Sequence, residues 1–454
     1  MAKHRGILTV VVLLILFTLI YWIVVYRILH KPDIPSEPNI FALVEPNVRV
    51  RILNTADNIH LQALSDWLIK DGTQGADTSL PANSQLTISL SPKNKLVLET
   101  ESLADKLVAD SLRLHSAVSG GELLIQNVPF GVGWWWEGKE DRVYEGELLV
   151  FPGDKQRIDV VVRLPLEAYL CGVVPYEIGA DAPKEALKAQ AIAARSEALM
   201  ALRSGLYKGT HYDLTSDVEC QVFAGNSKRT AQSDSAVYDT RGLSLFCEDE
   251  PIHAYYASNC GGHSEIIENV WPDRPRPATY TQGNFDSETI FSIDLSSEKL
   301  IYRWLMSSPD VYCNPEYYKA LPSWSRENFR WKKEFTTASL SMQIAKHKDI
   351  GMVQEIKVLK RGVSGRISAI RFIGDSGYLD VNSELAIRQI WRPPLRSSCF
   401  FVDEQGGLFT ILGAGWGHGV GMCQSGAIAQ AHQGEAYDEI LAHYYRDSQL
   451  KLLY

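Results

Sequence analysis

Residues 173–202 read VVPYEIGADAPKEALKAQAIAARSEALMAL, and this stretch decides how the middle of the chain folds. It predicts a helix that starts near Pro183 and stops at Gly205, because Pro suits the first helical turn and Gly suits the C-terminal cap. Asp181 or Ala182 is the expected N-cap residue. An apolar stripe at helical spacing is formed by Leu187, Ala191, Ala194, Ala198, Leu199 and Leu202. So many alanines allow another backbone to pack closely against this helix.

A single acidic residue, Glu177, precedes this helix among apolar neighbours, and no second acid occupies an obvious partner position. Burial among such neighbours would raise its pKa toward that of a general acid. A nearby helix N-terminus would act in the opposite direction and favour the carboxylate. Composition alone leaves two interpretations open, a catalytic acid and a solvated or helix-capping Glu, and it favours the second.

Outside this helix the chain is mostly strand-like. Before it, the segments VRVRIL, QLTISL, KLVLET and ELLIQNV alternate or run apolar, TQGADTSLPANS resembles an exposed loop, and RIDVVVRLP leads into a short helix over 166–172. After it, EIKVLKRG, ISAIRFIG and YLDVNS predict strands, whereas ELAIRQIW and AYDEILAHYYR predict short helices. We therefore expect an α+β fold, with residues 44–150 as a β-rich N-terminal part and residues 151–454 as the main domain.

The N-terminus predicts a membrane anchor. Residues 6–26 carry no charge over about the length that a helix needs to cross a bilayer. Lys3 and Arg5 precede this segment, so we expect the N-terminus to stay in the cytoplasm and the rest to be exported. No small-residue cleavage site follows, which favours a retained anchor. The expected arrangement is a single-pass transmembrane helix within 6–29, a Pro-rich linker over 30–43, and a folded part on the periplasmic or cell-wall side.

Bulk composition excludes one class of partner. The chain has 454 residues and a formal net charge of −9, which argues against nucleic acid because phosphate binding needs a basic face. The 7 cysteines are too sparse for a disulfide scaffold, and an odd number leaves at least one unpaired.

A glycine-rich stretch could also carry chemistry. GAGWGHGVGMCQSGA, residues 413–427, embeds His418 and Gln424 among glycines that allow a backbone to approach a ligand closely. We expect no regular structure in it. A tight structural turn with a satisfied His is an equally open interpretation. The spacing does not match a dinucleotide-binding fingerprint.

A scattered set of Cys and His residues suggests a metal site. Cys260 and His263 could share one zinc ion, with Cys220 or His211 completing the ligand set. No tight CxxC pair exists, so the alternative of buried thiols and surface imidazoles is favoured.

Taken in order, these segments resemble the SpoIID/LytB (stage II sporulation protein D) family. The likeness is carried by LPLEAYLCGVVPYEI, APKEALKAQAIAARSEA, CQVFAG, YYASNCGGHSE, GWGHGVGMCQSGA and YDEILAHYYRDSQL, in succession. It covers roughly residue 49 to the C-terminus and identifies 151–454 as a SpoIID-type catalytic domain. An aromatic-rich segment at about 285–335 matches little of the family pattern and looks like an irregular insertion.

The resemblance implies a lytic transglycosylase that acts on peptidoglycan strands stripped of their stem peptides. Glu177 matches the family's catalytic acid, and Gln221, Ser258, His418 and Gln424 are the expected substrate-binding residues. Family members with zinc hold it just ahead of the CQV motif; this chain keeps His211 and Cys220 there, but Thr215 or Ser216 stands where another Cys is expected. The implied chemistry requires no cofactor, so zinc stays an open expectation.

Two other functions remain open at this point. The chain could bind glycan without cleaving it and stimulate a cell-wall amidase, as LytB-type members are thought to do. It could also be a membrane-anchored scaffold built around the aromatic insertion. Retention of Glu177 within a full motif favours the enzyme, with peptidoglycan strands, the membrane and a cell-wall amidase as the expected partners.

Overall fold

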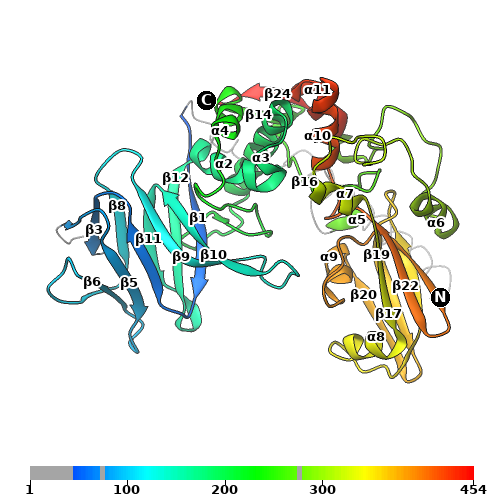
Figure 1. Ribbon diagram of the computed structural model, residues 1–454, viewed down its shortest axis with the longest axis horizontal. Coiled ribbons are helices and arrows are strands. Elements are labelled where there is room, and N and C mark those ends of the chain that lie inside the picture. The colour runs from blue at the N-terminus through cyan, green and yellow to red at the C-terminus, as the bar shows by residue number, and fades with distance from the viewer. Residues whose placement is uncertain (1–43, 72–76, 273–278) are drawn as a thin grey trace, which may run out of the picture. The chain divides into compact units, whose positions relative to one another are not determined.

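A computed structural model describes residues 44–71, 77–272 and 279–454 (Figure 1). The fold mixes α and β structure and is rich in strands, as the sequence predicted.

The predicted anchor at 6–29 and linker at 30–43 lie outside the described residues. In the part of the chain that is described, no helix is both long and apolar enough to cross a membrane. The anchor therefore stays a prediction from the sequence.

Two large sheets come first in the chain. The first has the strand order β13-β1-β12-β11-β8-β3-β4, with bounds Leu214–Thr215, Asn47–Thr55, Ile158–Pro165, Glu147–Pro152, Leu112–Ser116, Trp67–Asp71 and Thr78–Leu80. The second has the order β10-β9-β2-β5-β6-β7, with bounds Gly138–Glu145, Glu122–Phe130, Ile59–Ala63, Gln85–Leu90, Leu96–Thr100 and Leu107–Ala109. Alternate residues of β1 and β5 are buried, which is the pattern of strands with one face on a core.

The sequence divided this region differently in two places. Strand β12 pairs with both β1 and β11, so the first sheet crosses the boundary placed after residue 150. The short strand β4 lies within the segment TQGADTSLPANS, which was predicted as a loop. Its pairing partner β3 is supplied from outside that segment, so the local sequence gave little sign of it.

Helices dominate the middle of the chain. They are α2 (Leu166–Val174), α3 (Lys184–Ser204), α4 (Ala231–Asp239) and α5 (Ile267–Val270), with a π-helical turn η2 (Pro175–Gly179) and short 3-10 turns η1 (Asp154–Gln156) and η3 (Thr279–Thr281). The predicted long helix is confirmed as α3, and Gly205 ends it with φ 58°. The expected N-cap is wrong: Pro183 occupies that position, without a side-chain cap.

Helix α3 is packed on several sides. It contacts α2, α4, α10 (Gln424–Gln433), α11 (Tyr437–Tyr444) and the strand β14 (Leu243–Cys247). All of its alanines except Ala201 are fully buried, which permits this close approach from several directions. Strand β14 pairs with β15 (Glu250–Pro251) and β24 (Gln449–Leu452).

A buried ion pair fixes α3 against α2. Arg195 donates from Nε and Nη2 to the two carboxylate oxygens of Glu167, at 2.8 and 2.6 Å. The guanidinium also donates to the carbonyl oxygens of Leu243 and Val237, so both charges are hydrogen-bonded where water is excluded. This pair sets the position from which the chain continues into η2.

The remainder forms a third region. It contains the sheets β17-β22-β21 (Arg330–Thr336, Leu408–Ala414, Phe400–Gln405) and β18-β19-β20 (Val353–Arg361, Ile367–Gly374, Gly377–Asn382), with helices α6 (Glu298–Met306), α7 (Ser323–Phe329), α8 (Thr337–Ile344) and α9 (Glu384–Gln389). The expectation of an irregular insertion at about 285–335 is corrected, because α6, α7 and most of β17 lie within it. The amphipathic helix α6 buries Ile301, Trp304 and Leu305.

Candidate functional site

Glu177 lies in the π-helical turn η2, directly after α2. Such a turn widens the helix by one residue and re-aims a side chain, which is common at functional sites. The neighbours Pro175 and Ile178 are buried, whereas Glu177 itself is partly accessible. Glu177 is therefore a partly accessible residue whose carboxyl group is surrounded by protein, just before α3 begins.

The carboxyl group of Glu177 has two hydrogen-bond donors. The backbone N–H of Val222 donates to Oε1 with an N···O distance of 2.9 Å. The Nε2 of Gln424 donates to Oε2 at 3.5 Å and also to Oε1 of Gln190 at 3.2 Å. The acid is thus oriented by groups that lie 45 and 247 residues further along the chain.

Burial raises the pKa of Glu177 to about 6, while the hydrogen bonds from Val222 and Gln424 and the nearby Tyr256 hydroxyl act to lower it. Burial outweighs these donors. No other carboxylate appears among the groups that shift this pKa in the described part of the chain. Glu177 is therefore a lone carboxyl that holds its proton in mildly acidic solution.

Tyr256 was missed by the sequence reasoning. Its hydroxyl is buried near Glu177 and makes no hydrogen bond of standard geometry within the described structure. It lies in β16 (Tyr256–Ala257), which pairs in parallel with β23 (Met422–Cys423), just before Gln424. The signal was present in YYASN, since residues two apart on a strand share a face and Ser258 was already a candidate.

Two of the four predicted substrate-binding residues are buried. Gln424 contacts Glu177 directly. Gln221 instead donates from Nε2 to the carbonyl of Ala194 in α3, and its amide oxygen is buried without a partner. It thereby holds the segment in which Val222 reaches Glu177.

The other two lie near the glycine-rich stretch. The carbonyl of Ser258 accepts hydrogen bonds from both the N–H and the hydroxyl of Ser425, at 3.1 and 2.7 Å. The Nδ1 of His418 accepts a hydrogen bond from the N–H of Val420 at 3.0 Å. In the neutral ring the proton then lies on Nε2, which is a donor. Its ring centroid lies 5.0 Å from that of Trp271.

The glycine-rich stretch is only partly irregular, which corrects the expectation. Strand β22 ends at its start, and β23 and α10 occupy its end. Between them the backbone needs glycine: a Cβ on Gly421 would lie 1.9 Å from the carbonyl oxygen of Tyr255. A Cβ on Gly419 would likewise meet the guanidinium of Arg366. Close contacts with the Tyr255 backbone and the Arg366 side chain explain these two glycines.

A tryptophan cluster was also missed. Trp134, Trp135 and Trp136 form the tip of the hairpin between β9 and β10 (Figure 1), and the last two contact Trp416 with ring centroids 5.7 and 5.2 Å apart. Trp416 exchanges backbone hydrogen bonds with Asn259. The same hairpin reaches the site, since Glu140 of β10 accepts a hydrogen bond from the Tyr176 hydroxyl at 3.1 Å.

The four predicted metal ligands are not assembled in the structure. His211 stacks on Phe151 with ring centroids 3.8 Å apart, and the Cys220 thiol pairs with the Tyr207 hydroxyl. His263 bonds the carbonyl of its neighbour Ser264. Among the described residues, one group of three or more candidate ligands exists, and of the predicted four it contains only Cys260.

The zinc position implied by the resemblance therefore lacks a full donor set. His211 and Cys220 bring no third Cys, His, Asp or Glu ligand with them among the described residues. No step of the chemistry at Glu177 is assigned to a metal at that position.

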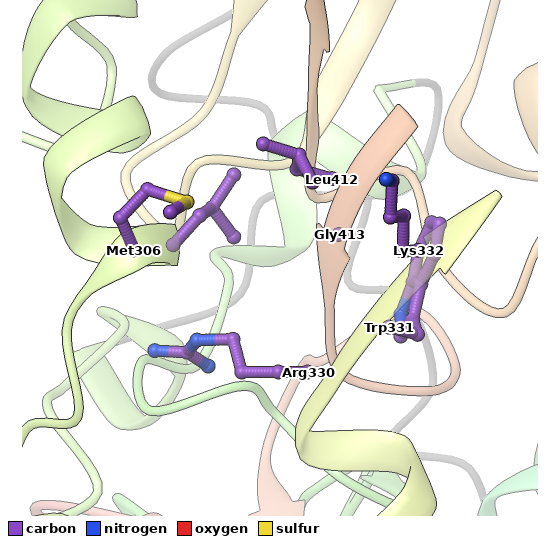
Figure 2. Close-up of a pocket in the computed structure, with 7 residues that line it drawn as sticks. Met306, Arg330, Trp331, Lys332, Leu412 and Gly413 are labelled. Atoms are coloured by element: carbon purple, nitrogen blue, oxygen red, sulfur yellow. The ribbon is translucent and has the colours of Figure 1, made fainter. Parts of the chain in front are cut away.

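A surface pocket of about 270 Å³ lies elsewhere in the fold (Figure 2). It is lined by Leu305, Met306, Arg330, Trp331, Lys332, Leu412 and Gly413. Neither Glu177 nor its hydrogen-bond donors Val222 and Gln424 line this pocket.

Comparison with known proteins adds independent information. A family model described as Stage II sporulation protein (SpoIID) matches residues 154–246, and a model described as a domain of unknown function (DUF8618) matches residues 265–421. The first match contains Glu177, Gln221 and Val222. The second covers most of the third region, including the aromatic-rich insertion.

Several curated proteins are similar over most of the chain. An uncharacterised protein of Brachyspira hyodysenteriae is 30% identical over 303 residues, covering 66% of this chain and 70% of the relative. Stage II sporulation protein D of Bacillus amyloliquefaciens is 28% identical over 299 residues, covering 63% and 74%. The amidase enhancer of Bacillus subtilis is 27% identical over 290 residues, covering 61% of this chain but only 39% of the relative.

The raised pKa of Glu177 predicts a pH-dependent cost of folding. Below pH 4.5 the carboxyl is protonated in both the folded and unfolded states, and above pH 6 the folded state must bury a charge. We expect Glu177→Gln to raise the free energy of unfolding by about 2 kcal/mol more at pH 8 than at pH 4. Denaturant titrations at both pH values measure this. The exposed Glu219→Gln serves as the control, and an equal effect of Glu177→Gln at both pH values would contradict the burial argument.

Proposed function

This chain belongs to the SpoIID (stage II sporulation protein D) family, and we propose that it is a lytic transglycosylase of peptidoglycan. The substrate is a glycan strand, stripped of stem peptides, and the bond cleaved joins N-acetylmuramic acid to N-acetylglucosamine. The observation that carries this proposal is the lone carboxyl of the partly accessible residue Glu177, with its pKa raised to about 6.

In the first step Glu177 is a general acid. Its protonated carboxyl donates a proton to the glycosidic oxygen, and the bond from C1 of the muramic acid to that oxygen breaks. The proton leaves with the N-acetylglucosamine hydroxyl. Glu177 becomes a carboxylate, which the N–H of Val222 and the amide of Gln424 stabilise at the moment its charge appears.

In the second step the same residue is a base. The C6 hydroxyl of the muramic acid attacks C1 and closes a 1,6-anhydro ring, while its proton passes to the Glu177 carboxylate. Proton and charge return to their starting state, and no water is consumed. A hydrolase needs a second carboxylate to activate water or to form a covalent bond. An internal nucleophile removes that need, which agrees with a site that has one acid.

We assign supporting roles to the neighbouring residues. Gln424 orients Glu177, and Gln221 secures the Val222 segment on α3. The buried Tyr256 hydroxyl lies beside the Glu177 carboxyl and favours its charged form. Ser258 and His418 are proposed to contact the strand beside them.

The tryptophan cluster supports a strand-binding surface. Trp135 is 39% exposed, and Arg396 lies over its ring with 5.8 Å to the centroid. Flat aromatic faces pack against the apolar faces of sugar rings, and adjacent cations provide hydrogen bonds. We propose that Trp135 and Trp416 hold sugars of the strand whose cleavable bond lies at Glu177.

Location and partners remain part of the proposal. The uncharged segment at 6–26 would anchor the enzyme in the cytoplasmic membrane, with Glu45–Leu453 on the periplasmic or cell-wall side. A cell-wall amidase would supply stripped strands. The similarity to an amidase enhancer favours such a partner, and it also supports a second candidate function, in which the chain binds glycan and stimulates the amidase without cleaving the strand itself.

The proposed chemistry predicts an acid-dependent activity. We expect cleavage of denuded glycan strands to fall as the pH rises through about 6, because the reactive form of Glu177 is the protonated one. Glu177→Gln should lower the rate at least about a hundred-fold, and the exposed Glu219→Gln should leave it unchanged. Mass spectrometry of the released disaccharides that end in 1,6-anhydro-N-acetylmuramic acid measures the rate. Full activity in Glu177→Gln would contradict the assignment. Strand binding with amidase stimulation but no cleavage at any pH would favour the enhancer.

The strand-binding surface makes a separate prediction. Trp135→Ala should weaken binding of the full-length protein to denuded strands by about ten-fold, while the pH dependence of cleavage stays unchanged. Tyr317, which is 52% exposed and outside the cluster, provides a matched Tyr317→Ala control. Co-sedimentation with the strands measures binding, and equal loss in both variants would remove the surface from the proposal.

A further inference from the structure

Four potential metal ligands meet in the core beside the candidate site. The thiols of Cys260, Cys313 and Cys423 and a carboxylate oxygen of Asp286 all lie within 4.8 Å of one another. All four residues are buried. They come from three separate segments of the chain, so the fold, not a local motif, brings them together.

We propose that Cys260, Asp286, Cys313 and Cys423 bind one structural zinc ion. Zinc prefers four ligands in a tetrahedron and accepts thiolate and carboxylate together. Four protein ligands leave no open position, which is the mark of a structural and not a catalytic zinc site. This site shares only Cys260 with the metal set expected from the sequence, and it does not depend on the chemistry proposed at Glu177.

The sulfur spacing fits zinc better than a disulfide. The Sγ atoms of Cys260 and Cys313 are 3.7 Å apart. Two thiolates on a tetrahedral zinc with Zn–S distances of about 2.3 Å lie about 3.8 Å apart. A disulfide would need about 2.05 Å and a closure of the two segments.

The ligands are also oriented as metal ligands are. The Sγ of Cys423 accepts from the N–H groups of Cys260 and Gly426, at 3.2 and 3.4 Å, and the Sγ of Cys260 accepts from the N–H of Gly262 at 3.3 Å. Such N–H···S bonds stabilise thiolates. Outer-shell partners of this kind set the direction of metal ligands.

Asp286 is oriented in the same way. Its Oδ1 accepts from the Tyr444 hydroxyl at 2.6 Å and its Oδ2 from the N–H of Cys313 at 3.1 Å. Within the described residues, no Lys or Arg forms an ion pair with this buried carboxylate, and the nearest candidate cation is the His443 ring at 4.0 Å. A buried carboxylate is costly unless it is paired with a cation, binds a metal or takes up a proton.

The buried Arg366 and the half-buried Arg330 offset the charge of the site. Three thiolates and one carboxylate around Zn²⁺ leave a net negative charge. Arg330 donates to the carbonyl of Gly261 at 3.0 Å, and Arg366 donates to the carbonyl of Cys260 at 3.2 Å. Arg366 therefore bonds the backbone of a ligand residue, and Arg330 bonds the residue after it, so both positive charges lie close to the zinc centre.

The zinc ion would link the aromatic-rich insertion to the segments that carry the candidate site. Cys423 immediately precedes Gln424, which contacts Glu177, and β23 pairs with the β16 strand that carries Tyr256. Asp286 and Cys313 belong to the aromatic-rich insertion. We infer that the ion holds β16, β23 and the insertion in register behind the carboxyl group of Glu177.

Metal analysis of the purified full-length chain tests the site. We expect about one equivalent of zinc, retained in Glu177→Gln and in the buried control Cys171→Ser but lost in Cys423→Ser together with a lower Tm. Retention in Glu177→Gln separates this outcome from any failure of the proposed function. Because Cys423→Ser could fail to fold, a second measurement uses the unmodified protein: replacement of the metal by Co²⁺ should give the visible bands of a tetrahedral site and a thiolate-to-cobalt charge-transfer band. Less than about a tenth of an equivalent of metal, a Cys260–Cys313 disulfide found by mass spectrometry, or cobalt without the charge-transfer band would overturn the proposal.

Discussion

The candidate site depends on the balance between burial of the Glu177 carboxyl group and the hydrogen bonds donated to it. Removing it from water favours the neutral acid, and the hydrogen bonds from Val222 and Gln424 favour the carboxylate. Burial is the larger of the two effects, so the pKa of Glu177 is raised to about 6. A group with such a pKa exchanges its proton readily near neutral pH, which is what a residue serving in turn as acid and base requires.

This balance depends on groups that lie far apart in the sequence. Helix α3 fixes Gln190 and, through its carbonyl at Ala194, the segment of Gln221. The buried pair of Glu167 and Arg195 holds α3 against α2, whose end becomes the π-helical turn. A small rotation of α3 would move both the carboxyl and its donors, so the alanine-rich packing around the helix also determines the chemistry.

Sequence patterns predicted individual helices and strands, but they missed how segments distant in the chain pair with one another. The helix over 184–204 followed from the apolar stripe and Gly205, and the alternating strands were found where periodicity was strong. The predicted boundary after residue 150 separates β1 from β12, whereas in the structure β12 pairs with β1 and β11 in one sheet. The N-cap was misjudged because Asp181 is a good capping residue, yet the helix starts beyond it.

The candidate site shows the same limit. Composition alone treated Glu177 as a capping residue, and only the ordered family motifs pointed to catalysis. The burial of Glu177 could not be inferred from the sequence, because Gln424, which donates a hydrogen bond to it, is 247 residues away. The zinc ligands Cys260, Cys313 and Cys423 have no short spacing that would mark them, and the Trp134–Trp136 hairpin gives no sign in the sequence that it reaches Trp416.

The central claim is that Glu177 works without a second carboxylate because the sugar supplies its own nucleophile. Digestion of denuded glycan strands in H₂¹⁸O, followed by mass spectrometry of the new chain ends, tests this most directly. We expect 1,6-anhydro ends that contain no ¹⁸O. New reducing ends that each carry one ¹⁸O atom would show that water attacks C1, and would contradict it.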